Sequence, residues 1–341
     1  MRRPEELLAP ALLVLGAALL GLAASVSTQA YFVDTLVKVS IVVALYVFIG
    51  NSGVVSFGQI SFVAVGAWTA GVLSVPSSEK PAIMPNLAHF LRQTTVGNVP
   101  SLALAALAGL VFALLVGLPL MRLSGLSAGI ATFAVLAITN NLLRYYEKIG
   151  PGLNAFSSVP ETTGIWQAAI GALVAVALAF GYQRSRYGRM LRATREDRPA
   201  ASAAGISVYR QRLLAFTLSG AIAGFAGGLY IHLLPLNIDA FYLDLTFITL
   251  AMLVIGGSGS LLGAVVGALA VSGLDSFLAA AENGVDVLGW HIDLPAGTRL
   301  IVVGVLMTLV LILRPSGITG GREFSLTRRR PPETTAAEPA A

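Results

Sequence analysis

Few side chains in this sequence could carry chemistry, and their types exclude several kinds of site. The chain has no cysteine, which rules out disulfides, iron–sulfur clusters and metals held by thiolates. Its three histidines, His89, His232 and His291, have no ligand spacing between them, so we expect no metal site and interpret each as a satisfied interfacial residue. None of the lysines, at positions 38, 80 and 148, follows a glycine, so the chain has no GxxxxGK[ST] phosphate loop.

Ionisable residues within apolar stretches are the next candidates, because a charge in a bilayer is costly and marks function by default. Asp275 lies deep in an apolar run and is the strongest candidate; the alternative is a hydrogen-bonded structural carboxylate. Asp34 and Lys38 are four residues apart and could pair on one helix face, but we favour Lys38 extending to the outer membrane surface. Asn140 and Asn141 could line a pathway or simply end a helix at the interface.

The elements that must position these residues are membrane helices. The residues AVILMFWYC make up 56% of the chain and DEKR only 11%, against roughly 25% charged residues in a soluble globular protein. These values exclude a soluble enzyme and a disordered chain. We predict an all-α, polytopic membrane protein with eight to ten transmembrane helices, each needing roughly 20 apolar residues. The candidate spans are residues 7–26, 37–50, 59–75, 101–120, 125–143, 166–182, 213–234, 245–255, 261–280 and 300–313.

The basic residues indicate which ends of the helices face the cytoplasm. With the N-terminus inside and the sides alternating, 16 of the 22 Lys and Arg residues fall on the cytoplasmic side and five outside. This bias predicts that both termini are cytoplasmic, which requires an even number of crossings. It also assigns the net charge of +5 to membrane topology rather than to nucleic acid. We favour a retained first helix over a signal peptide cleaved after Thr28-Gln29-Ala30.

Two glycine-rich interruptions break the apolar pattern, at residues 50–59 and 256–260. Irregular backbone at membrane depth is tolerated where it is buried in protein or lines a wet cavity. The first is either a broken segment beside a pathway or an ordinary tight turn. The second also joins two apolar runs, and we interpret the Gly263 and Gly267 that follow it as helix packing. With Asp275, the candidate pathway residues in these interruptions are Asn51, Ser52, Ser56, Gln59, Gly257 and Ser258.

The third interruption, residues 183–212, is the longest and most basic of the predicted cytoplasmic loops. Asp197 can cap the start of a helix, and Pro199 is tolerated in a first turn. The alanines that follow favour helix, and Gly205 can end it in a left-handed conformation. A short helix at the cytoplasmic surface is therefore predicted. The alternative, a solvated basic loop, has slightly more weight on the residues alone.

At this loop the sequence resembles the M-type permease subunit of branched-chain amino-acid ABC importers. The matching stretches, in family order, are NSGVVSFGQISFVAVGAWTAG (51–71), GRMLRATREDRPAASAAGISVYRQRLLAFTLSGAIAGFAGGLY (188–230), IGGSGSLLGAVVGA (255–268) and LRPSGITG (313–320). The resemblance implies that the short helix is a coupling helix, which docks on a cytoplasmic ATPase. The contact positions that it implies are Arg195, Glu196, Asp197, Ala201 and Gly205.

The resemblance also implies the function and the partners. We expect a permease domain over residues 1–320, followed by a disordered cytoplasmic tail over 321–341. As a non-enzymatic subunit in the bacterial inner membrane, in contact with lipid, the chain would import branched-chain or related amino acids. It would have no cofactor, because ATP would bind to two ATPase subunits. A second, homologous permease and an external binding protein would complete the assembly. The alternatives are a urea or amide importer permease and an ion-coupled secondary transporter; a membrane-embedded enzyme would need a cluster of acids, histidines or cysteines that the sequence lacks.

Overall fold

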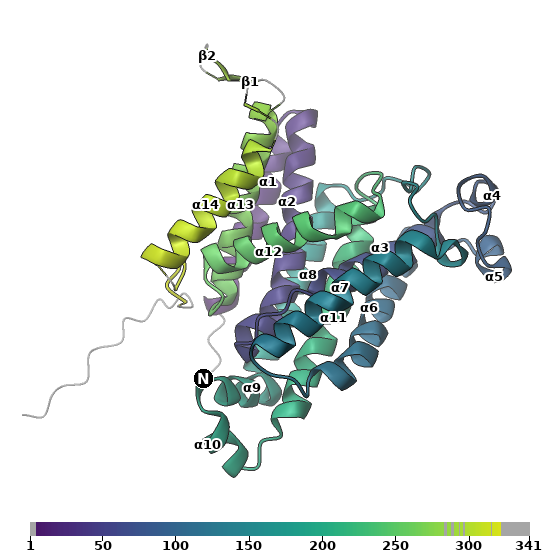
Figure 1. The fold of residues 1–341 in the computed structure, drawn as a ribbon. Coiled ribbons are helices and arrows are strands. Elements are labelled where there is room, and N and C mark those ends of the chain that lie inside the picture. Colours follow the sequence, from purple (N-terminus) through teal and green to yellow (C-terminus); the bar gives the residue numbers. More distant parts are fainter. Residues whose placement is uncertain are drawn as a thin grey trace, which may run out of the picture.

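A computed structural model describes residues 5–282, 285–287, 290–292, 294–295, 297–314 and 316–321. Within these ranges the chain is almost entirely helical, as predicted, with one two-stranded antiparallel hairpin that sequence analysis did not predict (Figure 1). The predicted tail lies outside the described residues, except for Gly321. In chain order the elements are α1 (Glu5–Ala23), α2 (Val26–Leu45), η1 (Tyr46–Gly50), α3 (Gln59–Ser74), α4 (Lys80–Ile83), α5 (His89–Gln93), α6 (Asn98–Leu120), α7 (Leu126–Tyr145), η2 (Glu147–Ile149), α8 (Ile165–Arg184), α9 (Arg186–Glu196), α10 (Arg198–Ala203), α11 (Val208–Ile231), η3 (Ile238–Phe241), α12 (Leu243–Gly256), α13 (Leu261–Glu282), β1 (Val285–Val287), β2 (Trp290–Ile292) and α14 (Thr298–Leu313).

The apolar helices correspond to the ten candidate spans. Among the described residues, eight helical stretches are long and apolar enough to cross a membrane. Two shorter apolar helices, Gln59–Ser74 and Thr298–Val310, account for the remaining candidates. A helix satisfies its own backbone hydrogen bonds, which is why apolar runs of this length fold as helices in lipid.

The boundary between the first two spans differs from the prediction. α1 ends at Ala23, and α2 begins at Val26 after a turn at Ala24 and Ser25, eleven residues before the predicted start. Polar residues such as Gln29 and Asp34 made this stretch resemble an outer loop, but they belong to the helix. The candidate cleavage pattern at 28–30 therefore lies inside α2. α1 packs against α8, α2 and α13.

The second helix is the centre of the bundle. α2 packs against α8, α11, α13, α1 and α12, so it has protein on most of its sides. The side chains of Leu36, Val39 and Val43 are completely buried. The second half of α2, from Val39 to Leu45, is buried on every side, as is typical of such a central position.

The helices α3, α6 and α11 pack on one another backbone to backbone through glycines. A Cβ atom on Gly66 of α3 would clash with the carbonyl oxygen of Gly224 of α11. One on Gly109 of α6 would clash with the carbonyl oxygen of Gly220, and one on Gly227 with that of Val63. Since lipid tails are as apolar as leucine, close van der Waals packing of this kind holds membrane helices together.

The short helices α9 and α10 lie together at one end of the molecule, at the bottom of Figure 1. The helices α4 and α5 and the hairpin lie away from them, toward the right and upper edges of the same view. The long loop between α8 and α11 therefore forms a separate structured layer below the apolar helices, where the sequence predicted a short helix.

The close approach of α3 and α11 predicts that Gly227→Ala lowers stability. The added methyl group must push the helices apart, and overpacking of this kind costs about 1–3 kcal/mol. The measurement is the thermal unfolding of the purified chain in detergent, followed by circular dichroism. Gly181→Ala on α8 is the control, because a Cβ atom at that position meets open space. An unchanged unfolding temperature for Gly227→Ala would contradict the packing described.

Candidate functional site

The basic loop after α8 folds into two helices. Ser185 begins α9, and its hydroxyl oxygen accepts a hydrogen bond from the backbone N–H of Gly188 at 3.1 Å. Leu191 is completely buried where α9 packs against α8 and α11. Sequence analysis missed this helix because its many arginines resembled a solvated loop. The spacing of Gly188, Leu191 and Thr194, all buried, is the helical signal that could have found it.

The second helix of the loop is the one predicted. A carboxylate oxygen of Asp197 accepts a hydrogen bond from the backbone N–H of Ala200 at 2.9 Å, as an N-cap does. The helix ends at Gly205, which has a φ of +80°. The backbone N–H groups of Gly205 and Ile206 donate to the carbonyl oxygens of Ser202 and Ala201, which together form a Schellman motif. Start, proline position and glycine stop are thus all confirmed.

The five positions expected to contact an ATPase are not equally accessible. Arg195, Glu196, Asp197 and Gly205 are exposed at the end of α9 and around α10. Ala201 is only 7% exposed, so most of its surface is already covered by this chain. The four exposed positions form a surface that a partner chain can contact, and Ala201 packs beneath this surface.

The end of α2 is irregular and polar. The helix widens into the π-helical turn η1 before it stops at Gly50. The side-chain amide of Asn51 donates to the carbonyl oxygen of Val47 at 3.0 Å, and the guanidinium of Arg195 donates to that of Gly50 at 2.6 Å. The chain then turns at Gly53, with a φ of +68°, and is not helical again until α3. The first interruption is therefore an irregular connection between two helices, longer than a tight turn.

Polar side chains in this connection are buried. Asn51, Ser52, Ser56 and Gln59 are each at most 5% exposed. The hydroxyl oxygen of Ser219 on α11 lies 3.0 Å from the carbonyl oxygen of the Gln59 side chain. Among the described residues, three polar atoms here have no hydrogen-bond partner in the protein: Asn51 Oδ1, Ser56 Oγ and Gln59 Nε2. Buried polar atoms of this kind are suited to bind water or a polar solute.

The second interruption lies against the first. α12 ends at Gly256, and Gly257 turns the chain with a φ of +116°. A Cβ atom on Gly50 would lie 2.7 Å from the carbonyl oxygen of Ser258, so the two connections touch. The hydroxyl of Thr319, from the segment after α14, donates to the carbonyl oxygen of Gly256 at 2.8 Å. The four stretches that carry the family resemblance, 51–71, 188–230, 255–268 and 313–320, therefore each have residues at this end of the bundle.

Asp275 does not belong to this group. It lies fourteen residues beyond the start of α13, which is about 21 Å along the helix. The structure thus brings together six of the candidate pathway residues and separates the seventh from them. The glycines that follow the second interruption are packing positions, as expected, because a Cβ atom on Gly267 would clash with the carbonyl oxygen of Met252.

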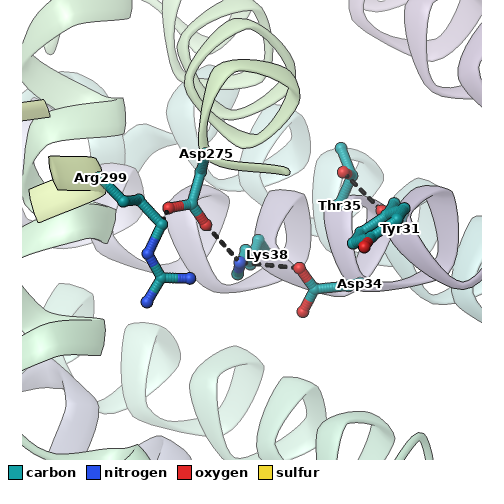
Figure 2. A network of polar contacts seen from close by, with 6 residues as sticks. All are labelled: Tyr31, Asp34, Thr35, Lys38, Asp275 and Arg299. Carbon is teal, nitrogen blue, oxygen red and sulfur yellow. Dashed lines mark hydrogen bonds and ion pairs between the residues drawn. The ribbon is translucent and has the colours of Figure 1, made fainter. Parts of the chain in front are cut away.

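Asp275 instead forms part of a network of four charges, in which Lys38 and Asp275 are buried and Asp34 and Arg299 are partly exposed (Figure 2). The ammonium of Lys38 lies 2.7 Å from the carboxylate of Asp34 and 3.4 Å from that of Asp275. The guanidinium of Arg299, at the start of α14, lies 3.3 Å from the second oxygen of Asp275. The network connects α2, α13 and α14.

The expectation that Lys38 reaches the membrane surface is wrong. Its side chain is only 10% exposed, because α2 is the central helix and no short path leads from it to the surface. The i, i+4 pair with Asp34 forms instead. The carboxylate of Asp275, whose side chain is 5% exposed, completes the neutralisation.

The remaining candidate residues, two asparagines and three histidines, belong neither to the polar breaks nor to the charge network. Asn140 is buried and donates to the carbonyl oxygen of Ile238 at 3.3 Å, whereas Asn141 is exposed and bonds within its own helix. His232 is buried beside the carbonyl oxygen of Pro160, and burial lowers the pKa of its imidazole. His89 is exposed, and the side chain of His291 lies outside the described residues.

The fold and the site define a class of protein. A multi-pass bundle of apolar helices, with a structured loop at one end and buried polar breaks beside it, is typical of a membrane permease. The sequence comparison agrees: residues 27–311 match the family described as branched-chain amino acid transport system / permease component. The chain belongs to this family, and it is a multi-pass inner-membrane transport component, not an enzyme.

Individual relatives support the assignment to this family. The chain is 26% identical to the high-affinity branched-chain amino acid transport system permease protein LivM of Salmonella typhimurium, over 83% of this chain and 68% of the relative. The corresponding protein of Escherichia coli matches with the same identity and coverage. The autoinducer 2 import system permease protein LsrC of Klebsiella pneumoniae is 34% identical over 45% of this chain and 46% of the relative. No solved structure matches the chain.

The charge network predicts that Lys38→Met strongly destabilises the fold. The substitution keeps the volume but leaves the buried carboxylate of Asp275 and the partly buried one of Asp34 with one remaining cation, and breaking a buried pair costs about 3–5 kcal/mol. Thermal unfolding in detergent measures the loss. Lys148→Met, at an exposed position, is the control, and adding Asp34→Asn to Lys38→Met should restore part of the stability. Equal stability of Lys38→Met and the wild type would refute the network's structural role.

Proposed function

We propose that this chain is the permease subunit of an ATP-driven importer that carries branched-chain or related amino acids into the cell. The observation that carries the proposal is the match of residues 27–311 to the permease family. The LivM proteins, which are similar over most of the chain, are named as permeases of high-affinity branched-chain amino acid transport. The exposed helix α10 supplies the kind of surface on which an energising subunit could act.

The proposal includes partner chains. The sequence has no phosphate-binding loop, so ATP binds to two cytoplasmic ATPase subunits rather than to this chain. A second, homologous permease completes the pathway, and an external binding protein delivers the solute. These partners follow from the family, in which the chain is one permease component of a transport system.

We assign the roles of the two groups of residues within this assembly. Arg195, Glu196, Asp197 and Gly205 face the ATPase, supported by their exposure, and Ala201 packs beneath them. The buried polar atoms of Asn51, Ser56 and Gln59, with Ser52, Gly257 and Ser258 nearby, border the pathway at the cytoplasmic end. Asp275 takes part through the network that holds α13 and α14 against α2.

We infer that both termini lie in the cytoplasm. Ten crossings, one for each of the eight long and two shorter apolar helices among the described residues, would return the chain to its starting side. The side that carries the basic loop with α9 and α10 also carries most of the Lys and Arg residues, as the positive-inside rule requires.

Two alternatives remain distinct from this proposal. The similarity to LsrC favours a different small polar solute, carried by the same mechanism, and a urea or amide importer belongs to the same alternative. An ion-coupled secondary transporter would need a carboxylate free to bind the coupling ion. Asp275 is the best candidate for that role, but it already lies near Lys38 and Arg299, which counts against this mechanism.

Uptake of radiolabelled leucine tests the function. Cells that express the chain with its partner subunits should accumulate leucine, and depletion of ATP at constant membrane potential should abolish the uptake. Competition by unlabelled urea and by autoinducer 2 separates the solute classes. Leucine uptake that persists without ATP would favour the secondary transporter, and uptake of another solute alone would assign that solute instead.

The coupling role predicts that Gly205→Val lowers uptake about tenfold or more without loss of the protein from the membrane. A β-branched residue resists the positive φ at this position, at a cost of roughly 1–2 kcal/mol, and the end of α10 must rearrange. Glu196→Arg should lower uptake in the same way, by reversing a charge on the docking surface. Gly97→Val and Glu161→Arg are the controls, since both positions are exposed and lie in the connections before α6 and α8, outside the loop that carries α10. Normal uptake by both coupling variants would count against the assignment.

A further inference from the structure

The carbonyl group of Gly50 needs a partner from elsewhere in the chain. The last carbonyl groups of a helix have no intrahelical donor, and at the end of α2 these groups lie among buried residues. Arg195 supplies the donor, with its Nη1 atom 2.6 Å from the carbonyl oxygen of Gly50. A positive charge at a helix C-terminus also interacts favourably with the helix dipole. A residue of the basic loop therefore caps the central helix.

The stem of the same side chain packs on the break. A Cβ atom on Gly53 would lie 3.0 Å from Cγ and 3.2 Å from Cδ of Arg195. Glycine at this position thus serves both the positive φ and the close approach of the arginine. Arg195 as a whole is exposed, because one side of it covers the break and the other faces outward.

A second connection runs parallel to the first. The guanidinium of Arg192, one turn earlier on α9, donates to the backbone carbonyl oxygen of Gln183 at 2.6 Å. The side-chain oxygen of Gln183 accepts a hydrogen bond from the hydroxyl of Tyr46 at 2.6 Å. Tyr46 is the first residue of the π-helical turn, and such turns are frequent at functional sites. α9 thus bonds the last residue of η1 directly, and it also bonds Gln183 of α8, whose side chain binds the first residue of η1.

The capped carbonyl group also lies beside the second break. Gly50 touches Ser258, and the hydroxyl of Thr319 donates a hydrogen bond to the carbonyl oxygen of the neighbouring Gly256. A displacement of Arg195 would therefore move Gly50 first and then the turn between α12 and α13. The contacts form a continuous series from the basic loop to both interruptions of the bundle.

We propose that Arg195 is a positioning residue that transmits movement of α9 and α10 to the break between α2 and α3. This inference rests on the proposed function, in which an ATPase moves these helices. It gives Arg195 a second role, directed into the membrane domain, beyond its expected contact with the ATPase. Loss of the side chain would leave the ATPase surface of Glu196 and Asp197 in place but detach it from the break.

The first arm of the test measures the position of the break without any transport assay. The chain has no cysteine, so Ser56→Cys, at a site 1% exposed, is a single reporter for maleimide labelling in membranes. Adding Arg195→Ala should raise the labelling rate about tenfold, the factor expected when one charge-assisted hydrogen bond no longer opposes local opening. Arg195→Lys, which keeps the stem and the charge, should give an intermediate rate. Arg189→Ala, an exposed arginine on the same helix, is the control and should change nothing.

The second arm measures coupling in the complete assembly, without the Ser56→Cys reporter. Membrane vesicles with the partner subunits should hydrolyse ATP when the chain carries Arg195→Ala, but they should import about tenfold less leucine per ATP hydrolysed. A merely structural defect would lower both rates together through loss of protein, which immunoblotting of the membranes detects. Arg189→Ala should keep the wild-type ratio.

The two arms separate the possible failures. Unchanged labelling of Ser56→Cys in the Arg195→Ala background overturns the positioning role. Faster labelling with an unchanged ratio of uptake to hydrolysis overturns the transmission role. If the wild-type assembly imports no leucine, the proposed function fails by itself, while the labelling arm still decides whether Arg195 holds the break.

Discussion

The structure depends on one constraint: every backbone polar group inside the bundle needs a partner within the protein. An unbroken helix meets this condition by itself, but a helix that stops among other helices does not. Where α2 stops, Asn51 supplies a side-chain donor for Val47 and Arg195 supplies one for Gly50. Where α12 stops, Ile318 and Thr319 bind the carbonyl oxygens of Ile255 and Gly256. The breaks are stable because distant segments complete them.

This constraint also explains why the four stretches that carry the family resemblance are scattered along the chain. The stretches 51–71, 188–230, 255–268 and 313–320 are far apart in sequence, yet each contributes a donor, an acceptor or a glycine to one end of the bundle. A carbonyl group freed in one stretch is bonded by another. The motifs are therefore parts of a single arrangement, in which the helices of the membrane domain meet the loop beneath them.

Local patterns in the sequence predicted the local features correctly. The number of apolar helices, the helix between Asp197 and Gly205 and the packing role of Gly267 all follow from composition, capping and the need of glycine for close approach. Lys38 was misjudged because its burial depends on which helix is central, and periodicity does not reveal this. The hydrogen bond between Arg195 and Gly50 joins residues 145 positions apart, and no pattern in the sequence around either residue predicts it. α9 was missed because its three buried positions stand among arginines.

The charge network around Lys38 has a consequence for the electrical behaviour of the membrane domain. Its formal charges, two carboxylates against one ammonium and one guanidinium, sum to zero. Moving one elementary charge through a membrane potential of 100 mV costs or yields about 2.3 kcal/mol. A group of four that shifts as one body carries no net charge through that field. When the helices α2, α13 and α14 move together, the network itself therefore adds no voltage dependence to the energy of that movement.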